Sequence, residues 1–533
     1  MSTLFEDILG GDDDAVVRAL RAGASPEATD EGETALYRAA VANEAGIVRV
    51  LLAAGADPGR GSGEGAGDLP LCGAACGGHG EVVRALLGAG ARPDQEESYG
   101  FTAMDWAVRL GHAETVRILL EHGADPQRPG PDGLVPLVAA ARRGSTPSVR
   151  ALLEYGAGPL PDALAEARRW VGVDIAAELR RGLLDGAEGD GTYECVVRRV
   201  PEDGGVTVVV ELLREDGAPG RGNERQTGHA AIVTLLEAEL GVRAPHEELA
   251  ARALRCGDRD QDDWREAVAA LARYPDEETF RTAAAWCAGD EPLRRALGAQ
   301  VLGAALSTGP DHRAHGRGRP DPAGPRRHSP GAGGDLTAEG VAILRRLAAD
   351  TRRGGVSPVA ADADPGRPGA DREPALAVVA ALGAVGDASA LPELLPFASH
   401  PDGEVRRALG CALTGLVPAG RPEAVDTLVR LSRDHDAGVR DWATLALAEL
   451  PEDTPLLREV LAARLQDTDP DTVAEAARGL AMRQDPRATE VLASILADGD
   501  PEGSARDTAL AALEHIGNER VRTRLEWTVP RCR

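Results

Sequence analysis

Two cysteines and a histidine lie at a spacing that could hold a metal ion. Cys72, Cys76 and His79 form a C-x3-C-x2-H pattern, and thiolate and imidazole are the usual ligands of tetrahedral zinc. The remaining cysteines are scattered and do not complete such a set in sequence: Cys195, Cys256, Cys287, Cys411 and Cys532. The alternative is a structural role for Cys72 and His79, which depends on the repeats described below.

The glycine-rich stretch at residues 59–67, GRGSGEGAG, has the composition of a phosphate-binding loop. Such a loop is followed by Lys and then Ser or Thr, and it lies between a strand and a helix. The chain contains no lysine, so all 59 of its basic residues are arginine. We therefore expect an elongated hairpin loop here. The absence of lysine also excludes Schiff-base, phosphate-loop and kinase-type chemistry.

Charge and cysteine usage restrict the partners and the compartment. The formal net charge is −27 and the pI is about 4.9, which repels phosphate groups, so we expect no nucleic-acid and no membrane partner. An odd number of scattered cysteines does not indicate a disulfide framework and favours a reducing cytoplasm. We expect no export signal and no membrane-spanning helix. Basic residues that are all arginine are typical of a GC-rich genome, here a bacterial one.

The elements that position these residues form a repeating pattern. The endings AGAS, AGAD, AGAR, HGAD and YGAG recur at a nearly constant interval, which is marked by their glycines: Gly23, Gly55, Gly90, Gly123 and Gly156. Segments such as VVRALL precede each ending, and segments such as TALYRAA and TAMDWAV lie between them. In residues 99–125, two patterns with helical periodicity flank a Gly111-His112 turn. Each period therefore predicts two helices.

This pattern resembles the ankyrin repeat over residues 1–160, with about five repeats. The resemblance implies stacked helix pairs with a continuous core and projecting hairpin loops. Cys72 then takes the position of the motif histidine and His79 belongs to the turn between the helices, so we favour structural roles for both. Thr34 and Thr102 are predicted to cap first helices.

Ankyrin proteins usually bind partners through hairpin tips and the exposed positions of the first helices. Carried onto this chain, the resemblance implies a partner-binding surface of seven residues: Arg38, Tyr99, Phe101, Trp106, Arg109, Arg142 and Arg143. Aromatic residues are only 3% of the chain, and their clustering beside arginines is typical of interface anchors. The alternative for Trp106 is packing against the next repeat.

The middle of the chain, residues 161–307, predicts irregular helices. Residues 161–184 predict one more helix pair, a degenerate closing repeat, and residues 192–214 predict an isolated β-hairpin. We expect disordered linkers at 308–335 and 352–373, on either side of a helix at 336–351. The first linker contains an arginine cluster that could tether to the acidic surface of the protein itself or simply contribute to solubility, and the less favoured alternative is nucleic-acid binding: Arg313, Arg317, Arg319, Arg326 and Arg327.

A second repeating pattern, with an interval close to that of the first, occupies residues 374–533. Equivalent points of this pattern follow acidic turns and lie at Val405, Val439, Val473 and Ala505. The pattern resembles HEAT repeats, especially the short bacterial type found in phycobilisome lyases, and residues 291–306 look like an earlier member. The acidic residues, among them Asp402 and Asp436, are expected to cap second helices and to pair with Arg406 or Arg440.

Two classes of enzyme are built from HEAT-like repeats. HEAT-like deoxyhypusine hydroxylases hold iron through several His-Glu dipeptides, whereas only His246-Glu247 is present here. HEAT-like DNA glycosylases use aromatic and acidic residues in a basic groove. Asp441 beside Trp442 is similar to that arrangement, but the strong negative charge opposes the interpretation.

The sequence therefore predicts an all-α, extended α-solenoid with an ankyrin array followed by HEAT-like repeats. We expect a noncatalytic scaffold or adaptor that binds partner proteins in the cytoplasm, acts as a monomer and uses no cofactor or metal. The alternatives are a HEAT-like lyase or metal-dependent modifying enzyme, and an antitoxin-like regulatory binder.

Overall fold

The computed structural model describes residues 4–63, 65, 67–185, 193–202, 204–214, 218–307, 333–354, 372–498, 500 and 503–528. They fall into two compact units, one that runs to Ala270 and one that begins at Leu271. Both units are built mainly of helices, so the predicted helical solenoid fold is confirmed. None of the described helices combines the length and apolarity that crossing a bilayer requires. The linker arginines between Arg313 and Arg327 lie outside the described residues.

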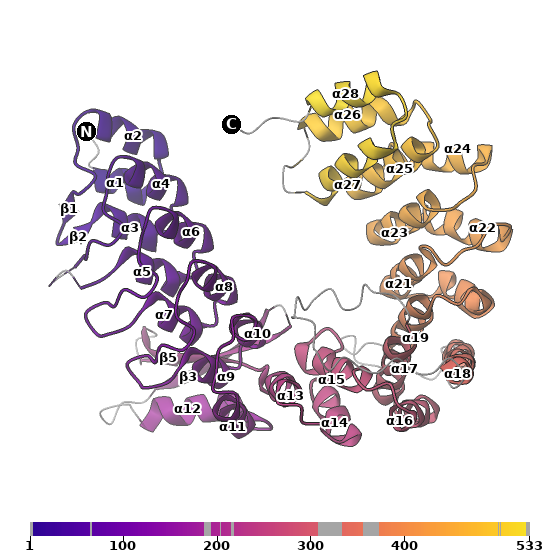
Figure 1. Cartoon of the computed structure of the whole chain (residues 1–533), viewed down its shortest axis with the longest axis horizontal. Coiled ribbons are helices and arrows are strands. Elements are labelled where there is room, and N and C mark those ends of the chain that lie inside the picture. Colours follow the sequence, from indigo (N-terminus) through magenta and orange to yellow (C-terminus); the bar gives the residue numbers. More distant parts are fainter. Residues whose placement is uncertain are drawn as a thin grey trace. The chain divides into compact units, whose positions relative to one another are not determined.

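The first unit begins with an array of helix pairs, in which helices of the same kind lie side by side (Figure 1). The first helices of these pairs are α1 (Leu4–Leu9), α3 (Ala35–Val41), α5 (Pro70–Gly77), α7 (Ala103–Leu110) and α9 (Pro136–Arg143). The second helices are α2 (Asp13–Arg21), α4 (Ala45–Ala53), α6 (Gly80–Gly88), α8 (Ala113–Glu121) and α10 (Thr146–Glu154). We call the loops that precede the first helices fingers: residues 24–34, with the short strands β1 (Thr29–Asp30) and β2 (Glu33–Thr34), and residues 56–69, 91–102 and 124–135.

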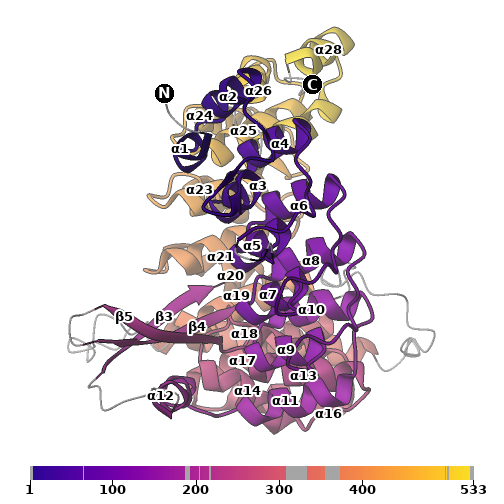
Figure 2. The ribbon, with the colours of Figure 1, turned by 90° about the vertical axis from the view of Figure 1, so that its left-hand side faces the viewer.

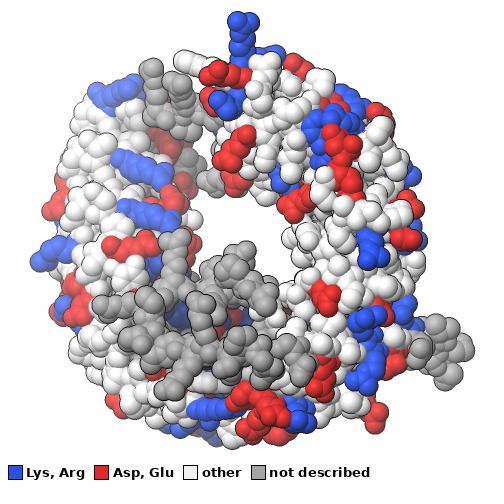
Figure 3. Space-filling view, turned by 45° about the vertical axis from the view of Figure 1, so that its right-hand side comes forward, with Lys and Arg blue, Asp and Glu red and all other residues white. Residues whose placement is uncertain are grey.

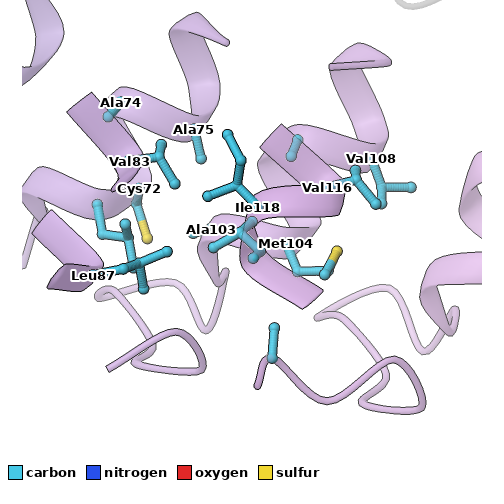
Figure 4. Packing of buried hydrophobic residues seen from close by; sticks show 14 of the residues in the cluster. Cys72, Ala74, Ala75, Val83, Leu87, Ala103, Met104, Val108, Val116 and Ile118 are labelled. Atoms are coloured by element: carbon cyan, nitrogen blue, oxygen red, sulfur yellow. The ribbon is translucent and has the colours of Figure 1, made fainter. Parts of the chain in front are cut away.

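The core of the array continues from each pair to the next. Figure 4 shows Ala103, Met104 and Ile118 of the fourth pair lying beside Val83 of the preceding pair, with Val116, also of the fourth pair, on the other side. All five are buried. Because each pair can bury its apolar face only against its neighbours, the stability of one pair depends on the pairs beside it.

Threonine begins two of the first helices, as predicted. The Thr34 hydroxyl accepts a hydrogen bond from the Tyr37 backbone N–H at 3.2 Å, and Thr102 forms a capping box with Asp105. Gly111 ends α7 with a φ of +80°, a conformation that favours glycine. These local signals determine where the helices begin and turn.

Histidines that follow the turns contact the preceding pair. His79 Nε2 lies 3.2 Å from the Val41 carbonyl oxygen, and His112 Nε2 lies 3.0 Å from that of Cys76. Each ring nitrogen therefore donates to a carbonyl near the C-terminal end of the preceding first helix. This contact gives His79 the kind of structural role that the sequence favoured.

A sixth helix pair extends the array, and its two helices are far apart in sequence. α11 (Leu160–Trp170) packs against α9 and against α13 (His229–Glu239), which also packs against α10. His229 Nε2 lies 3.2 Å from the Arg142 carbonyl oxygen, the same contact that the other two histidines make. A Gly-His turn therefore precedes α13, as it precedes the second helix of earlier pairs.

The segment between α11 and α13 forms an inserted helix and sheet. α12 (Ile175–Asp185) packs on an antiparallel sheet of order β3-β4-β5, formed by β3 (Glu194–Glu202), β4 (Gly205–Leu213) and β5 (Pro219–Gln226) (Figure 2). The prediction that residues 161–184 form a closing helix pair is wrong, because Ile175 and Leu179 of α12 bury against Val208 and Val210 of the sheet. Strands β3 and β4 lie where the sequence predicted a hairpin. β5, PGRGNERQ, was not predicted because it lacks apolar alternation.

The second unit contains a row of helices, each packed against the next: α17 (Pro292–Leu306), α19 (Arg372–Val385), α21 (Gly403–Leu413), α23 (Ala437–Ala448), α25 (Pro470–Met482) and α27 (Ser504–Ala512). Contact of α17 with α19 places residues 291–306 in this row, as the sequence predicted. The other helices in the described residues are α14 (His246–Cys256), α15 (Asp262–Ala272), α16 (Glu277–Ala288), α18 (Gly333–Gly354), η2 (Ala388–Ala390), α20 (Leu391–Leu394), η3 (Leu395–Ser399), α22 (Pro422–Leu431), α24 (Pro455–Arg464), α26 (Ala488–Asp498), η4 (Leu513–His515) and α28 (Glu519–Thr528).

Glycine and alanine allow the helices of this row to approach closely. A Cβ added at Gly303 would lie 2.7 Å from Ala381 Cβ, and one added at Gly383 would lie 2.7 Å from Ala412 Cβ. Atoms in a packed interior do not come that close. Glycine and alanine at these contacts therefore determine how closely the helices pack.

Aspartates and arginines form a ladder along the same row. Asp436 Oδ1 accepts a hydrogen bond from the Val439 N–H and so caps α23, as predicted. Arg440 Nη2 donates to Asp467 Oδ1 at 2.8 Å, and Arg406 Nε donates to Asp434 Oδ2 at 2.8 Å. The arginines therefore pair with aspartates two residues before the caps, rather than with the capping aspartates that the sequence predicted.

Candidate functional site

Three of the predicted binding residues form one stack on the fourth helix pair. The ring centroids of Phe101 and Trp106 lie 4.9 Å apart, with an interplanar angle of 29°. The Arg109 Cζ atom lies 5.1 Å from the Phe101 centroid. Phe101 belongs to the finger, whereas Trp106 and Arg109 belong to α7. We call these three residues the aromatic stack.

Carboxylates hold both ends of the aromatic stack. Trp106 Nε1 donates to Glu97 Oε1 at 2.8 Å, and Arg109 Nη1 donates to Asp132 Oδ2 at 3.1 Å. Trp106 is half-buried against the core of the array. Part of Trp106 therefore packs on the core, while part of its surface remains exposed.

Tyr99 lies at the tip of the same finger. Its side chain is 81% exposed, the largest value for a large hydrophobic residue in the part of the chain that the structure describes. An exposed tyrosine can cover a large contact area at a low cost in conformational entropy, because it has two rotatable side-chain bonds. The finger therefore presents a surface suited to a protein contact.

A shallow pocket borders the aromatic stack between α7 and α9. Residues of both helices and of the intervening finger line it: Met104, Asp105, Val108, Arg109, Asp132, Leu134, Pro136 and Ala139. Its lining combines apolar side chains with the paired Arg109 and Asp132. The pocket extends the contact surface toward the fifth helix pair.

Arg38 lies apart from the aromatic stack, on the second helix pair. Its Nε donates to Glu33 Oε2 at 2.6 Å, and its Cζ lies 5.8 Å from the centroid of the Phe5 ring. Its side chain is 24% exposed. Contacts within the first two helix pairs therefore use most of its hydrogen-bonding and packing capacity.

The expectation that Arg143 is exposed is wrong. Arg143 is 6% exposed and donates to both the backbone oxygen and the carboxylate of Glu224 in β5, as well as to the Leu110 carbonyl oxygen. The inserted sheet covers this side chain. Arg142 keeps a 41% exposed side chain, with Nε bound to Glu166 Oε1 at 2.9 Å.

A second cluster joins the insertion to the sixth pair. Arg225 of β5 lies with its Cζ 3.7 Å from the Trp170 centroid, and Trp170 stacks on His229 at 5.7 Å. Burial and the charges of Arg143 and Arg142 together lower the pKa of Arg225 to about 10. Burial and the charge of Arg225 lower the pKa of His229 to about 4, although the hydrogen bond to the Arg142 carbonyl oxygen opposes the shift. His229 is therefore neutral at physiological pH. Its contacts indicate a structural junction.

Sequence reasoning missed Glu97 and Asp132, which hold the aromatic stack. Asp132 belongs to the finger that follows α8, one period beyond the loop that carries Tyr99 and Phe101. Neighbouring fingers lie side by side, so residues one period apart become neighbours. A search for acidic residues one period beyond the finger that precedes Arg109 would have found Asp132. Glu97 could not be found in this way, because the conformation of its own finger brings it to the Trp106 indole.

The cysteine and histidine candidates occupy structural positions. Cys72 is buried, and burial together with the charges of Glu97 and Asp105 raises the pKa of its thiol. Across the described residues, no group of three or more His, Cys, Asp or Glu side chains is arranged to hold a metal ion. His79 instead contacts the preceding helix pair.

The other candidates also have structural explanations. In the glycine-rich loop, Ser62 accepts a hydrogen bond from the Thr34 N–H at 2.8 Å, and Arg60 donates to the Glu27 carbonyl oxygen at 2.8 Å, which ties the loop to the preceding finger. Burial and the charges of Glu475, Asp471 and Asp469 raise the pKa of Asp441 to about 7. The charges that act on Asp441 are acidic rather than basic. His246 is the first residue of α14, so it has the position of a helix start.

Charges of both signs are interspersed on the face shown in Figure 3. Most arginines of the array pair with acids, as Arg117 does with Glu154 and Arg128 with Glu96. No extended basic stripe of the kind that binds nucleic acids is visible on this face.

Family models match both arrays. Models of the ankyrin repeat match residues 31–61 and, with three copies, residues 58–130. A model of HEAT repeats matches residues 367–448 and 457–527. A comparison with curated proteins found no match. The first, fifth and sixth helix pairs lie outside the ankyrin matches and are assigned by their packing. The chain therefore carries ankyrin repeats in its N-terminal part and HEAT repeats in its C-terminal part.

Proposed function

We propose that this chain is a noncatalytic scaffold or adaptor of the cytoplasm, and that Tyr99 and the aromatic stack contact a protein partner. Ankyrin and HEAT repeats are protein-interaction modules, which supports partners that are proteins. The observation that carries the proposal is the 81% exposed Tyr99 beside the stack of Phe101, Trp106 and Arg109. Aromatic and arginine side chains are enriched among residues that dominate binding energy.

The cysteines support the noncatalytic and cytoplasmic parts of the proposal. The six cysteines of the described chain are free thiols. Burial raises the pKa of Cys256 to about 11 and that of Cys287 to about 12. Because the thiolate is the nucleophile, these thiols are poorly reactive at neutral pH. Free thiols are also typical of a reducing compartment.

Affinity purification followed by mass spectrometry tests this function. The tagged full chain is compared with the double variant Tyr99→Ala/Arg109→Glu. Both side chains are exposed, so we expect helical content and melting temperature to stay nearly unchanged while a partner is lost. Tyr155→Ala is the matched control, because Tyr155 is also an exposed tyrosine of the array, at 42%.

The outcomes separate the function from the site. A partner recovered with wild type and Tyr155→Ala but not with the double variant supports both. Equal recovery with all three proteins contradicts the site. Recovery of no protein above background with wild type contradicts the scaffold function itself.

A further inference from the structure

Three carboxylates beside the aromatic stack have no arginine partner. Among the described residues, Asp68, Glu97 and Asp105 take part in no ion pair. Elsewhere in the fingers, four acids are paired with arginines: Glu27 with Arg60, Glu33 with Arg38, Glu96 with Arg128 and Asp132 with Arg109. Other described finger acids, such as Asp57, Asp94 and Asp125, also take part in no ion pair, so these three carboxylates are distinguished by their place beside the aromatic stack.

The three carboxylates are held near one another by the two fingers and α7. The Ser98 N–H donates to the Gly67 carbonyl oxygen at 3.1 Å, which joins the finger that carries Asp68 to the finger that carries Glu97. Glu97 accepts a hydrogen bond from the Trp106 indole, and Asp105 Oδ2 accepts from the Thr102 N–H and hydroxyl at 2.8 Å. Two of the carboxylates are thus fixed by contacts that leave their negative charge unneutralised.

The charges act on one another and on their surroundings. Burial raises the pKa of Glu97; the hydrogen bond from Trp106 opposes this, and the charges of Asp68 and Asp105 raise the pKa further. Burial raises the pKa of Tyr37 on α3, and the charge of Asp68 adds to that effect. The negative field therefore extends from α7 to α3.

Aromatic rings flank these charges on two sides. Tyr37 lies over Gly73 of α5, where an added Cβ would be 3.1 Å from Tyr37 Cε2. Trp106 lies on α7 and has the Glu97 carboxylate at its indole nitrogen. Because α3, α5 and α7 are neighbours in the array, the two rings border one surface. We call it the acidic aromatic surface: Tyr37, Asp68, Glu97, Asp105 and Trp106.

This composition selects cations. Aromatic faces attract guanidinium and ammonium groups, and carboxylates bind the same groups through charge-assisted hydrogen bonds. Within the protein, the Arg109 guanidinium already lies 5.1 Å from the Phe101 centroid. A cation bound beside Glu97 would relieve the repulsion among the three carboxylates.

We propose that the acidic aromatic surface binds an arginine or lysine side chain of an extended segment of the partner protein. This inference rests on the proposed function and specifies the chemistry of the partner. The three unpaired carboxylates carry the argument by charge complementarity, and the aromatic rings provide the apolar contact for the stem of the cationic side chain.

Fluorescence anisotropy with two labelled peptides tests the inference on the full-length chain. Both peptides have the same length, with three basic positions and one tyrosine among glycine and serine. One peptide carries arginine at the basic positions, and the other carries citrulline, which keeps the shape and removes the charge. At low ionic strength we expect the arginine peptide to bind about 10-fold more tightly or better, a preference that added salt reduces.

Charge-removing variants locate the binding. Glu97→Gln and Asp68→Asn are each expected to weaken binding of the arginine peptide about 2- to 5-fold, the change that follows from losing one exposed charge pair. Glu121→Gln is the matched control, because it removes one exposed charge on α8 of the same repeat. Asp68 is exposed, so its variant keeps the test valid if Glu97→Gln lowers stability.

Two results would overturn the inference. Equal binding of the arginine peptide to wild type, Glu97→Gln and Asp68→Asn would assign the attraction to the overall charge of −27. Equal binding of the two peptides, with Trp106→Ala weakening both, would mean that the surface takes neutral apolar segments. The second result leaves the proposed scaffold function standing, because only the partner chemistry would be wrong.

Discussion

Trp106 donates a hydrogen bond from its indole nitrogen to a Glu97 carboxylate oxygen 2.8 Å away. This contact fixes a finger to the first helix that follows it. It also connects the two features that we propose to contact a partner, since Trp106 belongs to the aromatic stack and Glu97 to the unpaired carboxylates. The geometry of the proposed binding surface therefore depends on this one pair.

Trp106→Phe should remove the donor while retaining an aromatic ring against Phe101. We expect a loss of about 1.5–3 kcal/mol in the free energy of unfolding, the usual range for a hydrogen bond to a charged group. The pKa of Glu97 should rise further, because the lost bond lowered it. Urea denaturation and an NMR titration of the Glu97 carboxyl measure the two effects. In a Glu97→Gln background, Trp106→Phe should lower the free energy of unfolding by a smaller amount. If the two substitutions together lowered it by the sum of their separate effects, the coupling between Trp106 and Glu97 would be contradicted.

Asp467→Asn should destabilise the second unit, because Arg440 would lose its partner at a site where the side chains are 12% and 4% exposed. We expect a loss of about 3 kcal/mol at pH 7, the lower end for breaking a buried pair. The loss of stability can be measured from amide hydrogen exchange in α23 and α25 as a function of denaturant concentration. Asp426→Asn, at an exposed position on α22, should change little.

The same ladder should make stability fall in acid. Burial alone would raise the pKa of Asp434 and Asp467, but hydrogen bonds from Arg406 and Arg440 hold both pKa values below the ordinary range. A depressed pKa contributes stability that is present above the unfolded value, about 3.9, and is lost as pH falls from there through the folded value. Asp467→Asn should flatten this dependence below about pH 4. An unchanged acid profile would argue against the ladder as its source.

Replacing either of two glycines by alanine should destabilise the protein, for a different reason in each case. Gly123 has a φ of +85° and open space around it, so Gly123→Ala should cost about 1 kcal/mol through backbone strain. Gly383→Ala should cost about 1–3 kcal/mol, because the new Cβ meets Ala412. Ala412→Gly should recover part of the second loss and none of the first. If Ala412→Gly restored the stability of both glycine variants, or of neither, these two causes would be contradicted. Thermal unfolding of wild type, the three single variants and the two double variants that carry Ala412→Gly measures the changes in stability.

Removing residues 171–227 should leave the sixth helix pair folded. Trp170 would then be followed by Gly228 and His229, as Leu110 is followed by Gly111 and His112. We expect α11 and α13 to remain packed, because they contact each other and the array directly, and Arg143 to become exposed to water. Circular dichroism should lose only the signal of α12 and the sheet. A larger loss of helix would mean that the insertion is needed for folding of the array.

Local signals in the sequence determined the helix pairs, the caps and the turns. Thr102, Asp105 and Gly111 act within a few residues of themselves, so their effects can be read without knowing the fold. The two nearly constant repeat intervals then predicted stacking, because each pair can bury its apolar face only on its neighbours. The same register brought Phe101, Trp106 and Arg109 to one place.

Only the tertiary structure decided that α11 pairs with α13 rather than with α12, and that Arg143 lies beneath β5. Both outcomes depend on contacts between segments that are far apart in sequence, and helix propensity and turn signals carry no information about such pairing. The unpaired state of Glu97 has the same origin, since it depends on which arginines the neighbouring fingers bring near. Local chemistry in the sequence thus specifies the repeats, whereas long-range packing selects which of their side chains remain available to a partner.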